Sequence, residues 1–478
     1  PANAQSWSAI LDDLFYRIKP LILVKTDAPG IRMSMFSMPS EPAFSTASSG
    51  SGIAPSVLKQ LSQRMLGSRR FRGNIVGSNA WAAAGAHTDT GGPIVAGDGH
   101  LELTAPAYFH QAGLDLSVLG EEDWHVRGNF MAGIPALGVG TNGKVAWSFT
   151  CFYSDTIDYF REVLVLDDAG QLVATEYQGE SKPVVATMET YTIRAAPVLD
   201  SVGGDVQAPS FELFDGRRLL SAEGRPAGPD EDGIDFGDGP IVLEDVDGDG
   251  EITGISYDAT FLDAGDLLGG YFDLSEAQDL TGFKDAQKKL MVTGSHFVAI
   301  EQAGGVLATG YHASPCRDVL ARSEDDTRFE AGADPQLVLD GTQYGGFKVT
   351  LDASGHPIPG EAGTANCTVP YERFPNVEDP AQGFVVSGNN DPSGLSFDGS
   401  IANDGVYIGG PWDIGFRGHR IDDRLGALVS ENAVTVDAMA SIQADVVSSG
   451  GARWSPHIID AVTHARAISA LGGEQAHE

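Results

Sequence analysis

The sequence predicts an α+β fold in which β-sheets are enclosed by helices. Sixty glycines and 25 prolines indicate many turns. Between residues 77 and 160, short apolar runs alternate with Gly, Pro and Asn, which is typical of strands and hairpins. Helical patterns occupy residues 274–292 and the segment from about 412 onward. Because sheets and helices both have an apolar face to bury, the expected architecture packs one against the other.

Local signals support individual elements. Thr141-Asn142-Gly143, followed by VAWSF, predicts a hairpin turn. Asp273 directly precedes the helical pattern at 274–292 and Glu276 follows Asp273 by three residues, which predicts that Asp273 caps the start of this helix. Further strands are expected in residues 161–260, 295–317 and 346–390, and an amphipathic helix between Trp7 and Val24.

The charge balance narrows the possible partners. There are 66 acidic and 30 basic side chains, giving a net charge of −36. Such a field repels phosphate backbones and anionic lipids, so nucleic-acid and membrane partners are disfavoured. It suits a secreted, soluble or calcium-binding protein, although an acidic surface for solubility alone explains the charge nearly as well. No apolar run approaches the roughly 18–20 residues of a membrane span.

The first part of the chain differs in composition from the rest. Residues 45–56 (STASSGSGIAPS) are small and polar, which indicates a linker. Residues 57–73 are basic, unlike the rest of the chain. The three cysteines allow at most one disulfide, and they form no CxxC pair for zinc or redox chemistry.

The strongest motif begins at Gly77. It reads Gly77-Ser78-Asn79-Ala80-Trp81 and is followed by PIVAGDGH at 93–100. Further blocks follow in order: GIPA at 133–136, TNGKVAW at 141–147, GPI at 239–241, VPY at 369–371, FP at 374–375, GFVVSGNN at 383–390 and FRGHRI at 416–421. Together these blocks resemble the penicillin acylase family of N-terminal-nucleophile hydrolases.

The resemblance implies a specific organisation. The fold would be an αββα sandwich with flanking helices. Residues 1–56 would be the end of an α chain with a linker, 57–77 a spacer that plugs the cleft, and 78–478 the β chain. The mature protein would then be a heterodimer cut from one precursor, periplasmic or secreted, and this sequence would be incomplete at both ends. The substrate would be a small N-acyl amide, such as a β-lactam antibiotic or an acyl-homoserine lactone.

Ser78 is the predicted nucleophile. A serine hydroxyl needs a base, and cleavage after Gly77 would create a free α-amine beside the Oγ of Ser78 itself. An α-amine has a pKa of about 7.7–8.0, which suits general base catalysis near neutral pH. One residue would then supply both nucleophile and base. The alternative is an ordinary turn serine.

An acyl-transfer intermediate carries an oxyanion, which needs donors aimed at it. The resemblance places two donors there, the backbone N–H of Cys151 and the side-chain amide of Asn389. The alternative for Asn389 and its neighbour Asn390 is a simple turn.

Two further residues are implied to support the nucleophile. His100 matches a histidine that orients the serine amine, where penicillin G acylases carry Gln; a structural histidine is the alternative. Arg417 matches an arginine that positions the catalytic Asn and the amine. An ion pair with Asp413 is an equally good interpretation of Arg417.

Two acidic clusters suggest structural Ca²⁺, which prefers carboxylate and carbonyl oxygens. The resemblance implies one site at Asp155, the Ile157 carbonyl and Asp158, with Asp404 as a distant ligand.

The second cluster, Asp245, Asp247 and Asp249, has the spacing of a calcium loop. It lacks the final glutamate, so a solvated acidic turn is the alternative. These clusters also keep open a rival function, a secreted calcium-binding protein that retains the fold without catalysis.

Overall fold

The computed structural model describes the chain from Gly77 to Ala470 with internal gaps. The gaps are 102–106, 121–123, 132–135, 170–171, 195–210, 222–241, 245–252, 261–262, 264, 292–293, 318–319, 361–367, 393, 395–399, 401, 404–405 and 410–411. The helix expected between Trp7 and Val24, the linker and the basic segment lie outside the described residues, so the proposed division of 1–56 from 57–77 stays a prediction.

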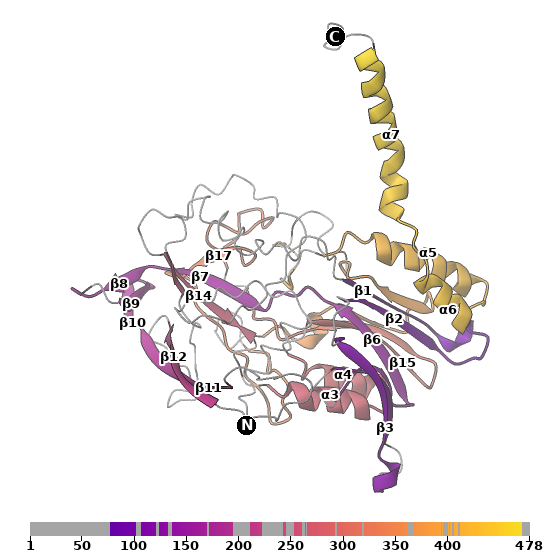
Figure 1. Ribbon diagram of the computed structural model, residues 1–478, viewed down its shortest axis with the longest axis horizontal. Coiled ribbons are helices and arrows are strands. Elements are labelled where there is room, and N and C mark those ends of the chain that lie inside the picture. Colours follow the sequence, from indigo (N-terminus) through magenta and orange to yellow (C-terminus); the bar gives the residue numbers. More distant parts are fainter. Residues whose placement is uncertain are drawn as a thin grey trace, which may run out of the picture.

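Two β-sheets form the centre of the molecule (Figure 1). The smaller has the strand order β19-β1-β2 and the larger the order β18-β16-β15-β6-β5-β4-β3. The small sheet comprises β19 (Phe384–Ser387), β1 (Gly77–Ala83) and β2 (Ile94–His100). The large sheet comprises β18 (Asn376–Glu378), β16 (Val306–Tyr311), β15 (Ser295–Glu301), β6 (Val145–Cys151), β5 (Leu137–Thr141), β4 (His125–Met131) and β3 (Phe109–Asp115).

The two sheets pack face to face through small and branched side chains. Ala80 and Ala82 of β1 belong to a buried cluster with Val298 of β15 and Val306 of β16. Their neighbours Trp81 and Ala83 belong to a different cluster. Because successive side chains of a strand point to opposite faces, β1 is covered on both sides, which explains the apolar run from Ala80 to Ala83.

Helices cover the outer face of each sheet. Trp81 packs with Ile421 and Leu425 of α5 (Phe416–Ser430) and with Ile442 of α6 (Val436–Gln443). On the other side, α3 (Leu267–Glu276) and α4 (Leu280–Gln287) pack against the large sheet through a core that includes Tyr271, Phe283, Trp147 and Phe297. The layers are therefore helix, sheet, sheet, helix, and the predicted αββα sandwich is confirmed.

The helix expected over 274–292 is instead two shorter helices. The caps are Asp266, which accepts from the Gly269 N–H at 3.0 Å, and Asp279, which accepts from the Gly282 N–H at 2.8 Å. Ala277 between them has extended backbone, with ψ 130°. The predicted cap at Asp273 is wrong, because Asp273 lies inside α3 and pairs with Lys289.

The hairpin at Thr141-Asn142-Gly143 is confirmed, with Gly143 at φ 86° between β5 and β6. The Asn142 side chain accepts from the N–H groups of Lys144 and Val145. Strands across 346–390 are less extensive than expected, since only β18 and β19 form in the described part of that stretch.

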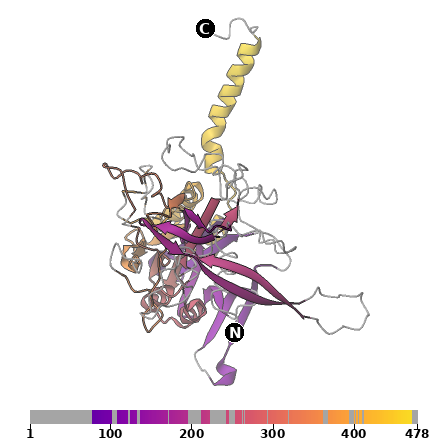
Figure 2. The same cartoon turned by 90° about the vertical axis from the view of Figure 1, so that its left-hand side faces the viewer.

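Smaller sheets extend from the sandwich. One has the order β13-β14-β7-β17, and its strand β7 directly follows β6 of the large sheet in the chain. Figure 2 shows β11 and β12 as a long two-stranded ribbon, while α7 projects away from both sheets. The bounds are β7 (Ile157–Glu162), β8 (Leu164–Leu166), β9 (Leu172–Tyr177), β10 (Glu180–Pro183), β11 (Val185–Arg194), β12 (Phe211–Ser221), β13 (Val242–Glu244), β14 (Thr253–Ala259), β17 (Val338–Asp340) and α7 (Ser449–Ala470). In the described part of the chain, no helix is both long and apolar enough to cross a membrane.

Candidate active site

Ser78 lies at the start of β1, the central strand of the small sheet. Alternate residues of a strand point to the same face, so the Ser78 side chain lies on the same face as Ala80 and Ala82, the face that packs against the large sheet. Its Oγ donates to the Gly77 carbonyl at 2.7 Å. The hydroxyl therefore lies directly against the peptide bond that precedes it.

Asn389 reaches Ser78 from 311 residues away. Its Oδ1 accepts from the Ser78 backbone nitrogen at 2.6 Å and from Arg417 Nη2 at 3.0 Å. Its Nδ2 donates to the Cys151 carbonyl at 3.0 Å. Ser78 and Arg417 donate to one end of the Asn389 amide, and the Cys151 carbonyl accepts from the other end. These contacts determine which amide atom is oxygen and which is nitrogen.

The backbone of Asn389 is held in an uncommon conformation. Its φ is 62° and the residue is 1% exposed. Asn tolerates this left-handed region better than most residues, but the conformation still costs about 1 kcal/mol or more. The turn that follows β19 thus directs the amide toward Ser78, and the simple-turn alternative does not account for these contacts.

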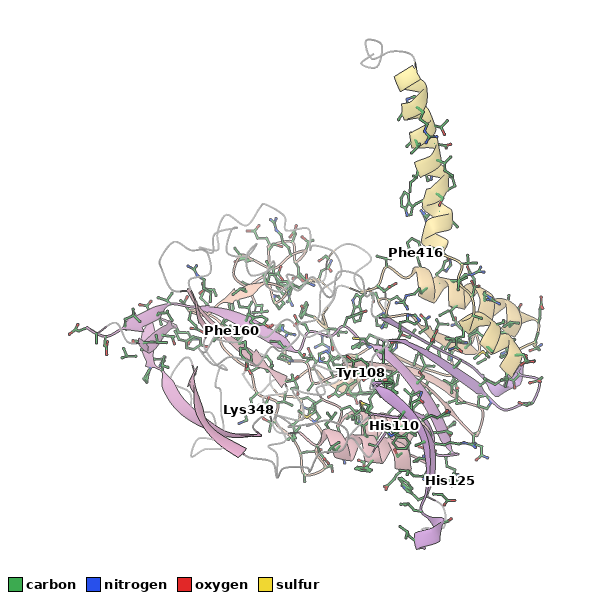
Figure 3. All side chains as sticks on the ribbon, in the orientation of Figure 1. Tyr108, His110, His125, Phe160, Lys348 and Phe416 are labelled. Carbon is green, nitrogen blue, oxygen red and sulfur yellow. The ribbon has the colours of Figure 1, made fainter. Side chains whose placement is uncertain are left out.

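Arg417, the second residue of α5, binds several site residues at once. Its Nη1 donates to the Ser78 carbonyl at 2.7 Å and to Asn79 Oδ1 at 2.6 Å. Its Nη2 also donates to the Gly388 carbonyl at 2.8 Å and to Asp413 at 3.1 Å. Positioning of the site and pairing with Asp413 were alternatives in the sequence. The structure contains the Asp413 pair together with contacts to Ser78 and Asn389, and the positioning role stays a prediction. Figure 3 labels the preceding residue, Phe416, at the start of α5.

His100 ends β2 directly opposite Gly77. Its Nε2 lies 3.3 Å from Asn79 Nδ2 and 3.4 Å from Asp98 Oδ2. The imidazole thus connects to Arg417 through Asn79 rather than contacting Ser78. Sequence reasoning missed Asn79 as a site residue, although its place directly after Ser78 in the motif was the available signal.

Cys151 is the last residue of β6. Its carbonyl is the atom that meets Asn389. The structure therefore brings all five predicted residues into one region: Ser78, His100, Cys151, Asn389 and Arg417. Whether the Cys151 N–H serves an oxyanion stays a prediction.

A buried polar chain lies behind the site. Thr150 Oγ1 and Ser387 Oγ are 2.7 Å apart, and Ser387 Oγ is 3.0 Å from His296 Nδ1. Burial lowers the pKa of His296 to about 4. The imidazole is therefore neutral near pH 7 and acts as a fixed hydrogen-bonding group between the sheets.

The predicted calcium residues are only partly described. Asp155 and Asp158 are buried, and Ile157 between them begins β7 opposite Ala259. A guanidinium, that of Arg317, occupies the space beside both carboxylates. Asp404 lies outside the described residues, as do Asp245, Asp247 and Asp249, so the acidic loop stays a prediction.

Comparisons with known proteins show what this chain is similar to. A family model described as Penicillin amidase matches residues 12–476. An acyl-homoserine lactone acylase QuiP from Pseudomonas fluorescens (strain Pf0-1) is 25% identical over 361 residues, covering 74% of this chain and 35% of the relative. QuiP from Pseudomonas aeruginosa is 24% identical over 217 residues, covering 45% of this chain and 22% of the relative.

The chain therefore spans about a third or less of these relatives' length. Among solved structures, a thermostable penicillin G acylase from Alcaligenes faecalis matches with a TM-score of 0.46 and 18% identity. That match covers 76% of this chain and 51% of the other.

Proposed function

Because the chain belongs to the penicillin amidase family, we propose that it is a self-processing hydrolase of linear N-acyl amides with Ser78 as nucleophile. One observation carries the proposal: the backbone nitrogen of Ser78 is held at 2.6 Å by Asn389. Cleavage after Gly77 would turn that nitrogen into an α-amine already placed beside its own hydroxyl. The rival, a calcium-binding protein without catalysis, gives no reason for this convergence.

Self-cleavage is the first step of the proposal. The Ser78 hydroxyl lies against the Gly77 carbonyl group, where it would attack the carbonyl carbon and displace the Ser78 nitrogen. The resulting ester would be hydrolysed by water, leaving Gly77 as a carboxylate and Ser78 as a new N-terminus. The product would be an α/β heterodimer cut from one precursor.

Amide hydrolysis would likewise form an ester on Ser78 that water then hydrolyses. Ser78 Oγ attacks the substrate carbonyl carbon while its proton passes to the α-amine, directly or through one water. The α-amine then protonates the leaving nitrogen, and an acyl ester on Ser78 remains. Water attacks that ester, the acid leaves, and Ser78 regains its proton.

The oxyanion formed in each attack needs donors. Asn389 Nδ2 carries two hydrogens, and its contact with the Cys151 carbonyl uses one of them. We assign the second hydrogen, together with the Cys151 backbone N–H, to the oxyanion. An amide suits this role because it donates without bringing a charge.

The substrate class is an N-acyl compound such as an acyl-homoserine lactone or a β-lactam antibiotic. The names of the curated relatives favour the acyl-homoserine lactone. The test is a panel of long-chain acyl-homoserine lactones, aryl-acetyl amides and glutaryl-type amides, monitored by release of the free amine. Mass spectrometry of the full-length protein should find a fragment beginning SNAWAAAG, and an intact chain would favour the rival.

Replacing Arg417 should slow catalysis without weakening substrate binding. Arg417→Lys keeps the charge but loses the planar fork that binds Ser78, Asn79 and Asn389. On a substrate identified by the panel, kcat should fall about 10–100-fold with KM little changed, since small misplacements in a site cost this much. Arg420→Lys is the matched control, because Arg420 is on the same helix but pairs with Asp445.

The pH profile gives a second readout of Arg417. A nearby positive charge favours the neutral amine. Arg417→Lys should therefore leave unchanged the pH range over which the rate rises as the α-amine loses its proton. Arg417→Gln should move that rise to higher pH. If the rate of Arg417→Gln rises over the same pH range as that of the wild type, the result would contradict an amine base beside the guanidinium.

His100→Gln should retain measurable activity, and its activity should rise with pH over the same range as that of the wild type. The Ser78 α-amine, with a pKa near or below about 8, would still be the base. His100 contacts Asn79 and Asp98 rather than Ser78, so it would orient the site. The measurement is kcat/KM against pH on processed protein. A folded, processed but inactive variant would instead make the imidazole the base.

A further inference from the structure

The cluster around Asp155 and Asp158 joins three distant segments of the chain. Asp155 and Asp158 lie where β6 leads into β7, the strand on which Figure 3 labels Phe160. Arg317 follows β16 by six residues, and Tyr407 comes from near the C-terminal helices. All four side chains are buried, with Arg317 and Tyr407 each 5% exposed. Two buried carboxylates require a compensating positive charge.

Arg317 supplies that charge with directed hydrogen bonds. Its Nε donates to Asp158 Oδ2 at 3.0 Å and its Nη2 to Asp158 Oδ1 at 3.1 Å. This is the two-pronged pairing that the guanidinium geometry favours. The same Nη2 donates to the Asp155 carbonyl at 3.1 Å and lies 3.8 Å from Asp155 Oδ1.

Tyr407 completes the arrangement. Its hydroxyl donates to Asp155 Oδ2 at 2.5 Å, and the Arg317 guanidinium carbon lies 4.9 Å from the centre of its ring.

These contacts do not fit a calcium ion at the same place. Calcium needs 6–8 oxygen ligands at about 2.3–2.6 Å, and here both Asp158 oxygens and the Asp155 carbonyl already accept from Arg317. A divalent cation on these oxygens would sit against the guanidinium and be repelled by it. We propose that Arg317 is the resident cation of this site, so that Asp155 and Asp158 are held together without calcium.

The test compares the full-length wild type with Arg317→Ser and Arg317→Ser/Asp158→Asn. Thermal unfolding is measured in EGTA and in millimolar CaCl2. Arg317→Ser should lower Tm by about 5 °C in EGTA, because it leaves buried charges unpaired. Calcium should then raise the Tm of Arg317→Ser by about 3–5 °C more than that of the wild type. The added Asp158→Asn change should abolish this gain, and any calcium site elsewhere contributes equally to all three proteins.

Calcium content provides an independent measurement that does not depend on a folded Arg317 variant. Asp247→Asn in an otherwise unchanged chain disables the separate acidic loop. Elemental analysis of that protein after gel filtration should find no stoichiometric calcium. One equivalent that this protein retains and that a further Asp158→Asn change removes would overturn the proposal, as would tyrosine-sensitised terbium emission that calcium displaces and that depends on Asp158. So would an Arg317→Ser variant that folds but gains no stability from calcium.

Discussion

Ser78→Ala is expected to abolish both processing and amide hydrolysis. The full-length protein should stay a single chain, because no hydroxyl remains to attack the Gly77 carbonyl group that Oγ now contacts. Turnover should fall by at least about 10⁴-fold, since loss of the nucleophile removes the covalent pathway. Denaturing gels and mass spectrometry monitor the chain, and amine release from a panel substrate monitors hydrolysis.

Ser78→Cys is the matched comparison, because a thiol is also a nucleophile. It should still cleave after Gly77, more slowly than the wild type. Circular dichroism and Tm should show that both variants keep the fold. If Ser78→Ala matures normally, another protease makes the cut and self-processing is wrong. If it hydrolyses substrate normally, a different residue is the nucleophile.

Asn389→Ala is expected to lower kcat by roughly 10²–10³, the usual loss for one oxyanion donor. KM should change little, because the donor acts on charge that develops only in the transition state. Asn389→Asp is the sharper variant. It keeps the size of the side chain and an oxygen for Ser78 and Arg417, but it removes the donor and introduces a negative charge where the oxyanion forms.

Backbone strain could also contribute to the Asn389→Ala result, because φ at this position is 62°. Asn432→Ala is the matched control. Asn432 has φ 51° and contacts His87 instead of Ser78. A similar loss of activity in both variants would attribute the effect to strain, and near-normal turnover in Asn389→Ala would assign the donor to Asn390 or to backbone alone.

Several features of the site could be predicted because they are local in sequence. Ser78 stands within a five-residue motif, and Asn389 follows the short apolar strand that ends at Ser387. The Asn142-Gly143 turn is determined by residues in direct succession. The two helices between 267 and 287 were predicted less well, since Asp266, Asp273 and Asp279 are all plausible caps and only packing selects among them.

The sequence by itself determined the order of the motif blocks, and their family resemblance implied the αββα architecture and the five residues that lie in one region. Tertiary structure decided how they meet: Asn79 links His100 to Arg417, and Cys151 presents its carbonyl to Asn389. It also placed Arg317 beside Asp158, 159 residues away. A pair of aspartates attracts a metal ion and a guanidinium by the same electrostatics, and which of them fills the site depends on the side chain that the fold brings there.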